Sequence, residues 1–159
     1  MHFAHLIQIN DPGNPLVATL SREQLWHGLV LRAERPTLFV MGLDRCEIIH
    51  RTQTGIGRRL YFGKLVIEDA VRFFPPLKVH YLVPEQDEIP ASGLTMTIEA
   101  PQPDSLFVRF DYEDARVAAD TADAFYDTFR RSAYQEADID TIRVIRQLAA
   151  SGKLDTPLQ

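Results

Sequence analysis

Residues 58–84 read RRLYFGKLVIEDAVRFFPPLKVHYLVP, and this stretch decides the fold. Many of its apolar side chains recur at every second position, a spacing that is typical of β-strands. Gly63-Lys64 and Pro75-Pro76 interrupt the pattern, so we expect two short turns that separate three strands. Strands joined by such short turns pair as antiparallel hairpins. The stretch therefore predicts the centre of an antiparallel sheet.

The period of two extends from this centre in both directions, between Asp44 and Tyr112. We expect six strands in this region, near residues 45–52, 58–63, 65–74, 77–84, 93–100 and 105–113. Residues 2–10 alternate in the same way and end at Asp11-Pro12-Gly13, which favours a turn. The sequence thus predicts about seven strands in one sheet.

Two short helices are expected after the first strand. Ser21 and Gln24 have the spacing of a capping box, and Pro36 ends the helix that begins there. Residues 37–41 are expected to form a second, short helical turn.

A long amphipathic helix is expected after Asp120, which is a plausible N-cap. Its first apolar stripe consists of Ala122, Phe125, Phe129, Ala133 and Ala137, and we expect Phe125 and Phe129 to be buried. The stripe then rotates to Ile139, Ile142, Ile145 and Ala149. A straight helix of this length would run about 45 Å. We therefore expect a kink or break around residues 136–140 and an end at Gly152.

Composition limits the class of the protein. The 159 residues are expected to form one domain over residues 1–152, followed by a loose tail over 153–159. The net charge of −5 argues against nucleic-acid binding, and no apolar run has the roughly 20 residues needed for membrane insertion. Cys46 is the only cysteine, and the first residues lack the basic region of a signal peptide. We therefore expect a cytoplasmic protein.

An antiparallel sheet with one buried face needs a cover, and the terminal helix is the only predicted element that is long enough. Residues 2–10 with Asn14-Pro15, residues 21–26, residues 59–81 and residues 106–113 resemble the START-like helix-grip superfamily. This superfamily includes the birch-pollen allergen and the plant pathogenesis-related class ten proteins. The closer similarity is to the family named after the acetylaranotin-cluster protein AtaL. The resemblance implies an α+β helix-grip fold, in which a curved sheet wraps around the C-terminal helix.

Arg59 and Glu68 raise the question of which sheet face is buried. A two-residue turn at Gly63-Lys64 places them opposite each other. If Leu60, Phe62, Leu65 and Ile67 face the core, the pair is exposed. If Tyr61, Val66, Val79 and Tyr81 face inward, the pair lies in the cavity. A two-residue turn at Pro75-Pro76 would place Arg72 opposite Val79 and favours the second arrangement, whereas the number of aliphatic residues around Gly63 favours the first. Both remain open at this point.

Catalytic and metal motifs are weak. The segment from Gly57 to Leu65 fails as a phosphate loop because five residues separate its glycines and Leu65 has no hydroxyl group. His2 and His5 lie on opposite faces of a regular strand, as do Glu47 and His50, so neither pair chelates a metal. We therefore expect no catalytic residue, no metal and no cofactor.

Members of the superfamily bind lipids, sterols or aromatic natural products, and some catalyse cyclisation or hydrolysis. The resemblance implies that this chain binds a small, largely apolar ligand between its sheet and terminal helix. The alternatives are a cyclase-like or hydrolase-like enzyme in the same pocket and a protein-interaction or cochaperone module, with a homodimer as a further option. The expected ligand-binding residues are Trp26, Phe39, Arg59, Tyr61, Glu68, Tyr81, Met96, Phe110, Phe125 and Phe129.

Overall fold

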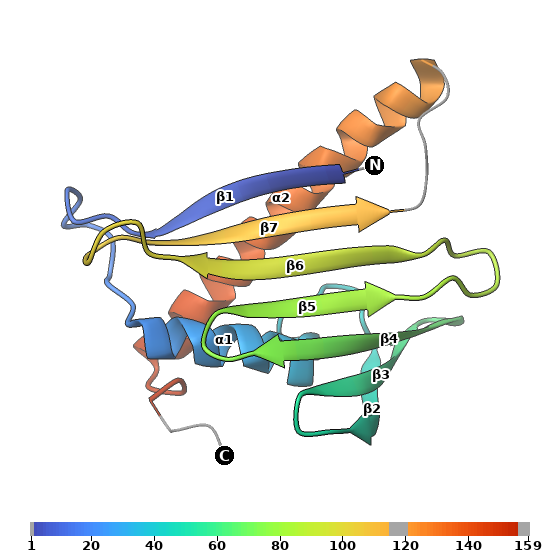
Figure 1. Cartoon of the computed structure of the whole chain (residues 1–159), viewed down its shortest axis with the longest axis horizontal. Coiled ribbons are helices and arrows are strands. Elements are labelled where there is room, and N and C mark those ends of the chain that lie inside the picture. Colours follow the sequence, from blue (N-terminus) through green and yellow to red (C-terminus); the bar gives the residue numbers. More distant parts are fainter. Residues whose placement is uncertain (1, 115–120, 156–159) are drawn as a thin grey trace.

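A computed structural model describes residues 2–114 and 121–155 of the chain. One curved antiparallel sheet has its helices on a single face (Figure 1). The strands are β1 (His2–Asn10), β2 (Arg45–Arg51), β3 (Gly55–Phe62), β4 (Leu65–Phe74), β5 (Lys78–Val83), β6 (Ser92–Glu99) and β7 (Leu106–Asp114). The helices are α1 (Arg22–Glu34), the 3-10 helix η1 (Pro36–Leu38) and α2 (Thr121–Ala150). The predicted α+β architecture is confirmed.

The strand order is β1-β7-β6-β5-β4-β3-β2. Short connections join β2 to β7 as a meander in which each strand pairs with the next. The first strand then pairs with the last, with Phe3 opposite Tyr112. This pairing brings the N-terminal strand beside the strand that precedes α2.

The register through β3, β4 and β5 decides which side chains face the helices. Arg59 lies opposite Glu68, as the Gly63-Lys64 turn predicts. Arg72, however, lies opposite His80 rather than Val79, because three residues separate Phe74 from Lys78 instead of two. A shift of one residue moves a side chain to the other face of a sheet. The sheet therefore follows the first sequence arrangement in the β3–β4 hairpin and the second in β5.

The face of the sheet that packs against the helices carries side chains from both arrangements. Leu60 from β3 is buried on the same face as Val79 and Tyr81 from β5. Arg59 and Glu68 lie on the other face and are exposed, so the expectation that this pair could enter the cavity is wrong.

Helix α1 begins with the predicted capping box. The backbone N–H of Gln24 donates to Ser21 Oγ at 3.0 Å, and the backbone N–H of Ser21 donates to Gln24 Oε1 at 2.9 Å. Gly28 lets α1 approach α2 closely, since a Cβ at this position would lie 2.8 Å from the Ile145 side chain. The second helical segment is η1, which begins at Pro36 rather than within 37–41.

Helix α2 is continuous over 30 residues, so a break around residues 136–140 is wrong. Its N-terminal end extends beyond the edge formed by β1 (Figure 1). Phe125 is 78% exposed and Phe129 is 67% exposed, so their expected burial is also wrong. The expected N-cap Asp120 and the side chain of Ala122 lie outside the described residues.

The inward face of α2 explains this correction. Ile142 and Ile145 are buried as expected, but Ile139 is exposed. Asp127 and Asp138 are buried on the helix in place of the phenylalanines. Asp127 accepts from Arg130 of the same helix, and Asp138 bonds Tyr112 and His5 of the sheet. A hydrophobic pattern alone does not reveal this polar stripe.

The core lies between the sheet and the two helices, and Trp26, Met96 and Phe110 are buried in it. Leu154 is also buried, and His27 Nδ1 lies 3.2 Å from its carbonyl oxygen. The start of the expected loose tail is therefore packed, while residues 156–159 lie outside the described part of the chain. No helix within the described residues is long and apolar enough to span a membrane.

The corrected orientation of α2 predicts different mutational costs along the helix. Phe129→Ala should change the free energy of unfolding by less than about 0.5 kcal/mol, because the ring is exposed. Ile145→Ala should cost about 2–5 kcal/mol, because it leaves a cavity in the core. Urea denaturation of both variants measures this difference, and a large loss for Phe129→Ala would contradict the orientation.

Candidate functional site

A cavity of about 240 Å³ lies on the inner face of the sheet, between the strands and the helices. Apolar side chains form much of its wall: Pro36, Val40, Leu43, Leu60, Phe62, Val83 and Leu94. An engineered apolar cavity of about 150 Å³ binds benzene. This cavity therefore has room for a molecule of one or two rings.

An ion pair between Arg58 and Asp69 crosses one wall of the cavity. Arg58 Nε donates to Asp69 Oδ1 at 2.8 Å, and Arg58 Nη2 donates to Asp69 Oδ2 at 2.6 Å. Arg58 Nη1 donates to the carbonyl oxygen of Ala33 at 2.9 Å. Burial alone would lower the pKa of Arg58, but the hydrogen bonds and charge of Asp69 outweigh burial and raise it. The pair is therefore ionised, buried and well bonded.

Tyr81 lies beside this pair. The Cζ atoms of Arg58 and Arg32 lie 5.1 Å and 5.2 Å from the centroid of its ring, within the range of cation–π interactions. Its hydroxyl group is shut off from solvent and has no hydrogen-bond partner among the described residues. A buried hydroxyl group without a partner costs free energy, so this one is an exception to the usual pairing of buried polar groups.

A second polar group holds α2 to the sheet. Tyr112 Oη donates to the two carboxylate oxygens of Asp138 at 2.7 and 2.8 Å, and His5 Nε2 lies 2.7 Å from Asp138 Oδ2. Burial raises the pKa of Asp138, and the hydrogen bonds from Tyr112 and His5 oppose this shift only in part. Burial and the nearby charge of Asp138 also raise the pKa of Tyr112. The phenol therefore stays protonated and points its proton at Asp138.

Tyr134 completes this side of the cavity. Its ring stacks on that of Tyr112 with centroids 4.0 Å apart. Arg130 Nη2 donates to Tyr134 Oη at 3.1 Å and to Asp114 Oδ2 at 2.5 Å. The polar stripe of α2 thus orients aromatic rings at the cavity wall.

The residues predicted to bind ligand separate into four groups. Tyr81 lines the cavity. Trp26, Met96 and Phe110 are buried in the core, against which Phe39 packs half-buried. Phe125 and Phe129 are exposed on α2. Arg59, Glu68 and Tyr61 belong to the outer face of the sheet, where the ring of Tyr61 lies 4.1 Å from Arg45 Cζ.

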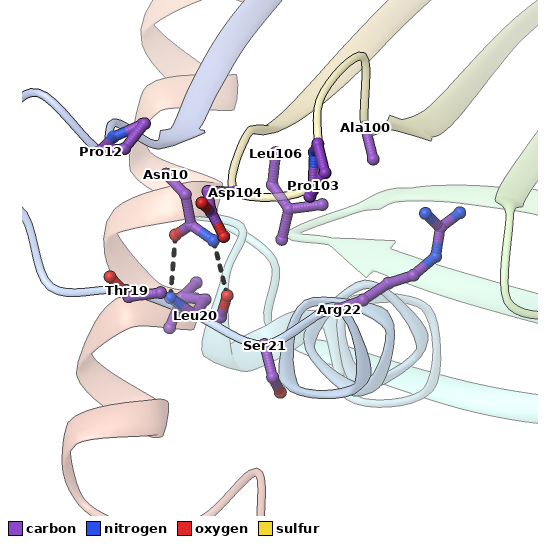
Figure 2. A pocket seen from close by; sticks show the side chains of 10 residues that line it. All are labelled: Asn10, Pro12, Thr19, Leu20, Ser21, Arg22, Ala100, Pro103, Asp104 and Leu106. Atoms are coloured by element: carbon purple, nitrogen blue, oxygen red, sulfur yellow. Dashed lines mark hydrogen bonds between the residues drawn. The ribbon is translucent and has the colours of Figure 1, made fainter.

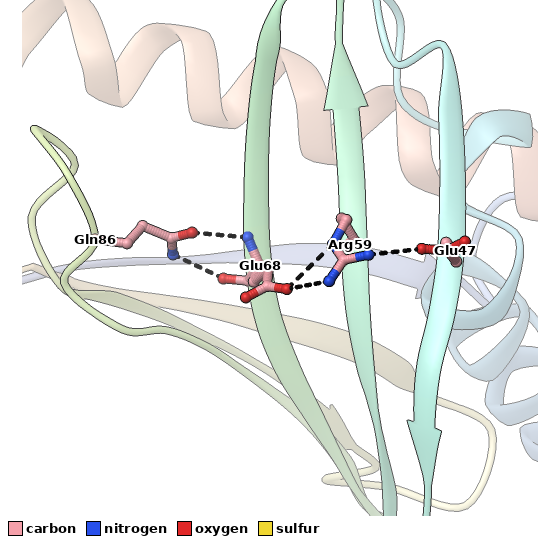
Figure 3. Close-up of polar contacts among 4 residues, drawn as sticks. All are labelled: Glu47, Arg59, Glu68 and Gln86. Carbon is pink, nitrogen blue, oxygen red and sulfur yellow. Dashed lines mark hydrogen bonds and ion pairs between the residues drawn. The ribbon is translucent and has the colours of Figure 1, made fainter.

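Arg59 is the centre of a polar network on the outer face (Figure 3). It bonds Glu68 at 2.8 Å and Glu47 at 3.0 Å. The side-chain amide of Gln86 accepts from the backbone N–H of Glu68 and donates to its carbonyl oxygen, both at 2.8 Å. Gln86 thus occupies the place of the strand partner that Glu68 lacks beyond the end of β5. This network holds the sheet and the loop after β5 together.

A larger hollow of about 530 Å³ lies at one end of the sheet, between the loops before α1 and after β6 (Figure 2). The Asn10 side chain accepts from the N–H of Leu20 at 2.9 Å and donates to its carbonyl oxygen at 2.7 Å. Ser21 at the rim caps α1. These polar groups satisfy the backbone of the loops, so we assign the candidate site to the inner cavity.

Sequence reasoning missed most of the polar lining of the cavity, namely Arg32, Arg58, Asp69, Tyr112 and Tyr134. One feature of the sequence could have revealed the Arg58–Asp69 pair. The Gly63-Lys64 turn places Arg58 opposite Asp69 as directly as it places Arg59 opposite Glu68. A three-residue turn at Pro75 would then have put this pair on the same face as Tyr81.

Comparisons with known proteins agree with this geometry. The family model of AtaL, described as acetylaranotin biosynthesis cluster protein L, matches residues 7–152. The chain belongs to this family. No curated protein sequence matches the AtaL-family chain closely enough to indicate a further relative.

Solved structures share the START-like helix-grip fold of this AtaL-family chain. The Zhui aromatase/cyclase from Streptomyces sp. R1128 is 12% identical, with a TM-score of 0.59 over 91% of this chain and 90% of that one. A START superfamily protein from Mycobacterium smegmatis is 12% identical, with a TM-score of 0.63 over 92% and 98%. Human STARD10 is 7% identical, with a TM-score of 0.64 over 94% and 64%. At these identities the likeness shows the fold alone.

The two ion pairs of the β3–β4 hairpin predict opposite mutational outcomes. Asp69→Asn should lower the free energy of unfolding by about 3–5 kcal/mol, because it leaves Arg58 buried without its counter-charge. Glu68→Gln should lower it by less than about 1 kcal/mol, because that pair is exposed. Urea denaturation decides the matter, and equal losses would contradict the assignment of the two faces.

The raised pKa of Asp138 predicts a pH dependence of stability. Its protonated form is favoured by folding, so this stabilisation is complete below the ordinary value of 3.8 and is lost as the pH rises through the higher folded pKa. The difference in unfolding free energy, wild type minus Asp138→Asn, should therefore fall as the pH rises above about 4. Asp111→Asn is the matched control, because it removes the carboxylate from the more exposed pair of His2 and Asp111. A difference that rises with pH would contradict the prediction.

Proposed function

We propose that the chain binds a small, largely apolar molecule in the cavity between the sheet and the helices. The feature that carries the proposal is an open cavity of about 240 Å³ on the inner face of the sheet, with aliphatic and aromatic side chains around it. Apolar side chains that face an open cavity keep their surface in contact with water, which is unfavourable. A ligand that filled the cavity would remove this surface from water.

Apolar burial would supply most of the affinity. Each Å² of apolar ligand surface removed from water contributes about 25 cal/mol before the cost of association. The Tyr112–Tyr134 stack and Phe62 offer flat surfaces, which suit an aromatic or alicyclic ring. The ligands of superfamily members, which include aromatic natural products, support the same class.

Catalysis in the same cavity is the alternative, since one structural neighbour is named an aromatase/cyclase. General acid–base catalysis needs a group that can give or take a proton near neutral pH. Tyr112 points its proton at Asp138, and its raised pKa keeps it protonated. Arg58 and Asp69 form an ion pair at the cavity wall, in which both carboxylate oxygens of Asp69 accept hydrogen bonds from Arg58. We therefore favour binding without turnover.

The interaction-module alternative loses its basis, because it required Leu60, Phe62, Leu65 and Ile67 to be exposed together. Leu60 is buried, and only Leu65 of the four is exposed. A homodimer and a cytoplasmic location stay predictions from sequence.

Binding to the cavity can be tested with 2-acetylnaphthalene, a neutral two-ring probe, by isothermal titration calorimetry. Val83→Trp, at the cavity wall, should lower its affinity by about tenfold or more, because the indole fills the space. Val66→Trp, on the exposed outer face, is the matched control and should leave the affinity unchanged. No saturable binding to the wild type, or an equal loss in both variants, would contradict the proposal.

A further inference from the structure

The residues that line the cavity carry a net positive charge. The charged ones are Arg32, Arg58 and Asp69, so two cations face one anion. Asp69 is fully engaged by Arg58. Within residues 2–114 and 121–155, no carboxylate forms an ion pair with Arg32, whose Nε donates to Thr141 Oγ1 at 3.2 Å. Arg32 therefore keeps its terminal N–H groups for another acceptor.

Asp138 is the carboxylate that could weaken this conclusion, because the charge of Arg32 acts on it. Its oxygens, however, already accept hydrogen bonds from Tyr112 and lie against His5. Asp138 thus offsets part of the charge of Arg32 through space without occupying its donors.

The ring of Tyr81 positions Arg32 at the cavity wall. Arg32 Cζ lies 5.2 Å from the centre of this ring, within the range of a cation–π interaction. The hydroxyl group of Tyr81 is shut off from solvent, so a ligand in the cavity does not reach it. A guanidinium group gives its strongest hydrogen bonds to an acceptor that bears negative charge. The N–H donors of Arg32 and a net positive charge thus lie at the wall of a largely apolar cavity.

Arg32 also lies between the cavity and a neighbouring groove. Arg32 and Val40 line both this cavity and a groove of about 430 Å³ between the η1 segment and α2. A charged ligand group at this boundary would keep part of its hydration, which reduces the cost of burying it. The apolar part of the same ligand would point inward, toward Leu60 and Phe62.

We propose that the ligand is a small aromatic or alicyclic carboxylic acid whose carboxylate binds Arg32 and whose ring fills the cavity. This inference rests on the proposed function and specifies the ligand's charge and orientation. The occupant is thus an organic anion rather than a neutral lipid or sterol.

Three probes of the same shape and different charge test the inference: 2-naphthoate, 2-acetylnaphthalene and 2-naphthamidine. Calorimetric titration of the wild type should give about tenfold tighter binding of the anion than of the neutral ketone, because a hydrogen bond to a charged group is worth about 1.5–3 kcal/mol. The cationic amidine should bind most weakly. The ratio of the anion's affinity to the ketone's affinity is the quantity to compare between variants.

Arg32→Gln should reduce this ratio toward one while leaving the affinity for the ketone within about threefold. Arg32→Lys, which keeps the charge, should retain part of the preference. Arg59→Gln is the matched control, since it removes one positive charge from the outer face, and it should leave the ratio unchanged. Circular dichroism of each variant verifies that it is folded.

The outcomes separate the two proposals. Equal binding of the anion and the ketone by the wild type would overturn the acid as ligand class while the binding function stands. Absence of binding by all three probes would overturn both. A ratio lowered as much by Arg59→Gln as by Arg32→Gln would show that the overall charge sets the preference, and would overturn the assignment of Arg32.

Discussion

The three-residue turn between β4 and β5 is the constraint on which the inner face of the sheet depends. Side chains alternate along a strand, so the length of each turn decides which face the next strand presents. With three residues in the turn, Val71 lies opposite Tyr81, and both are buried. A two-residue turn would have exchanged Tyr81 for the exposed Leu82 and removed the aromatic ring from beside Arg58.

The Arg58–Asp69 pair connects this sheet register to the helices. Its guanidinium group also bonds the carbonyl oxygen of Ala33, which is one of the last carbonyls of α1. These carbonyls lack partners within their helix and carry the negative end of its dipole, so a cation is favourable there. The pair thus fixes the C-terminal end of α1 against β3. Arg32, in the last turn of the same helix, is thereby held at the cavity wall.

The fold was predictable from sequence because periodicity, turn residues and capping residues all point to the same elements. The Ser21 capping box and the Gly63-Lys64 turn are local signals, and both are confirmed. The orientation of α2 was not predictable in this way. Asp138 is buried because Tyr112 and His5, distant in sequence, supply its hydrogen bonds. Of the residues expected to bind ligand, Tyr81 lines the cavity. Its position depends on the register between β4 and β5, which the double proline left ambiguous in the sequence.

Two departures from ordinary packing occur at the same place. The inner face of the sheet leaves an open cavity with largely apolar walls, and the hydroxyl group of Tyr81 lacks a partner within the described residues. A phenylalanine at residue 81 would relieve the second. Local rules are most often broken at functional sites. The hydroxyl group is shut off from solvent and out of a ligand's reach, whereas Arg32 lines the cavity. One bound anion would therefore cover the apolar wall and engage the arginine.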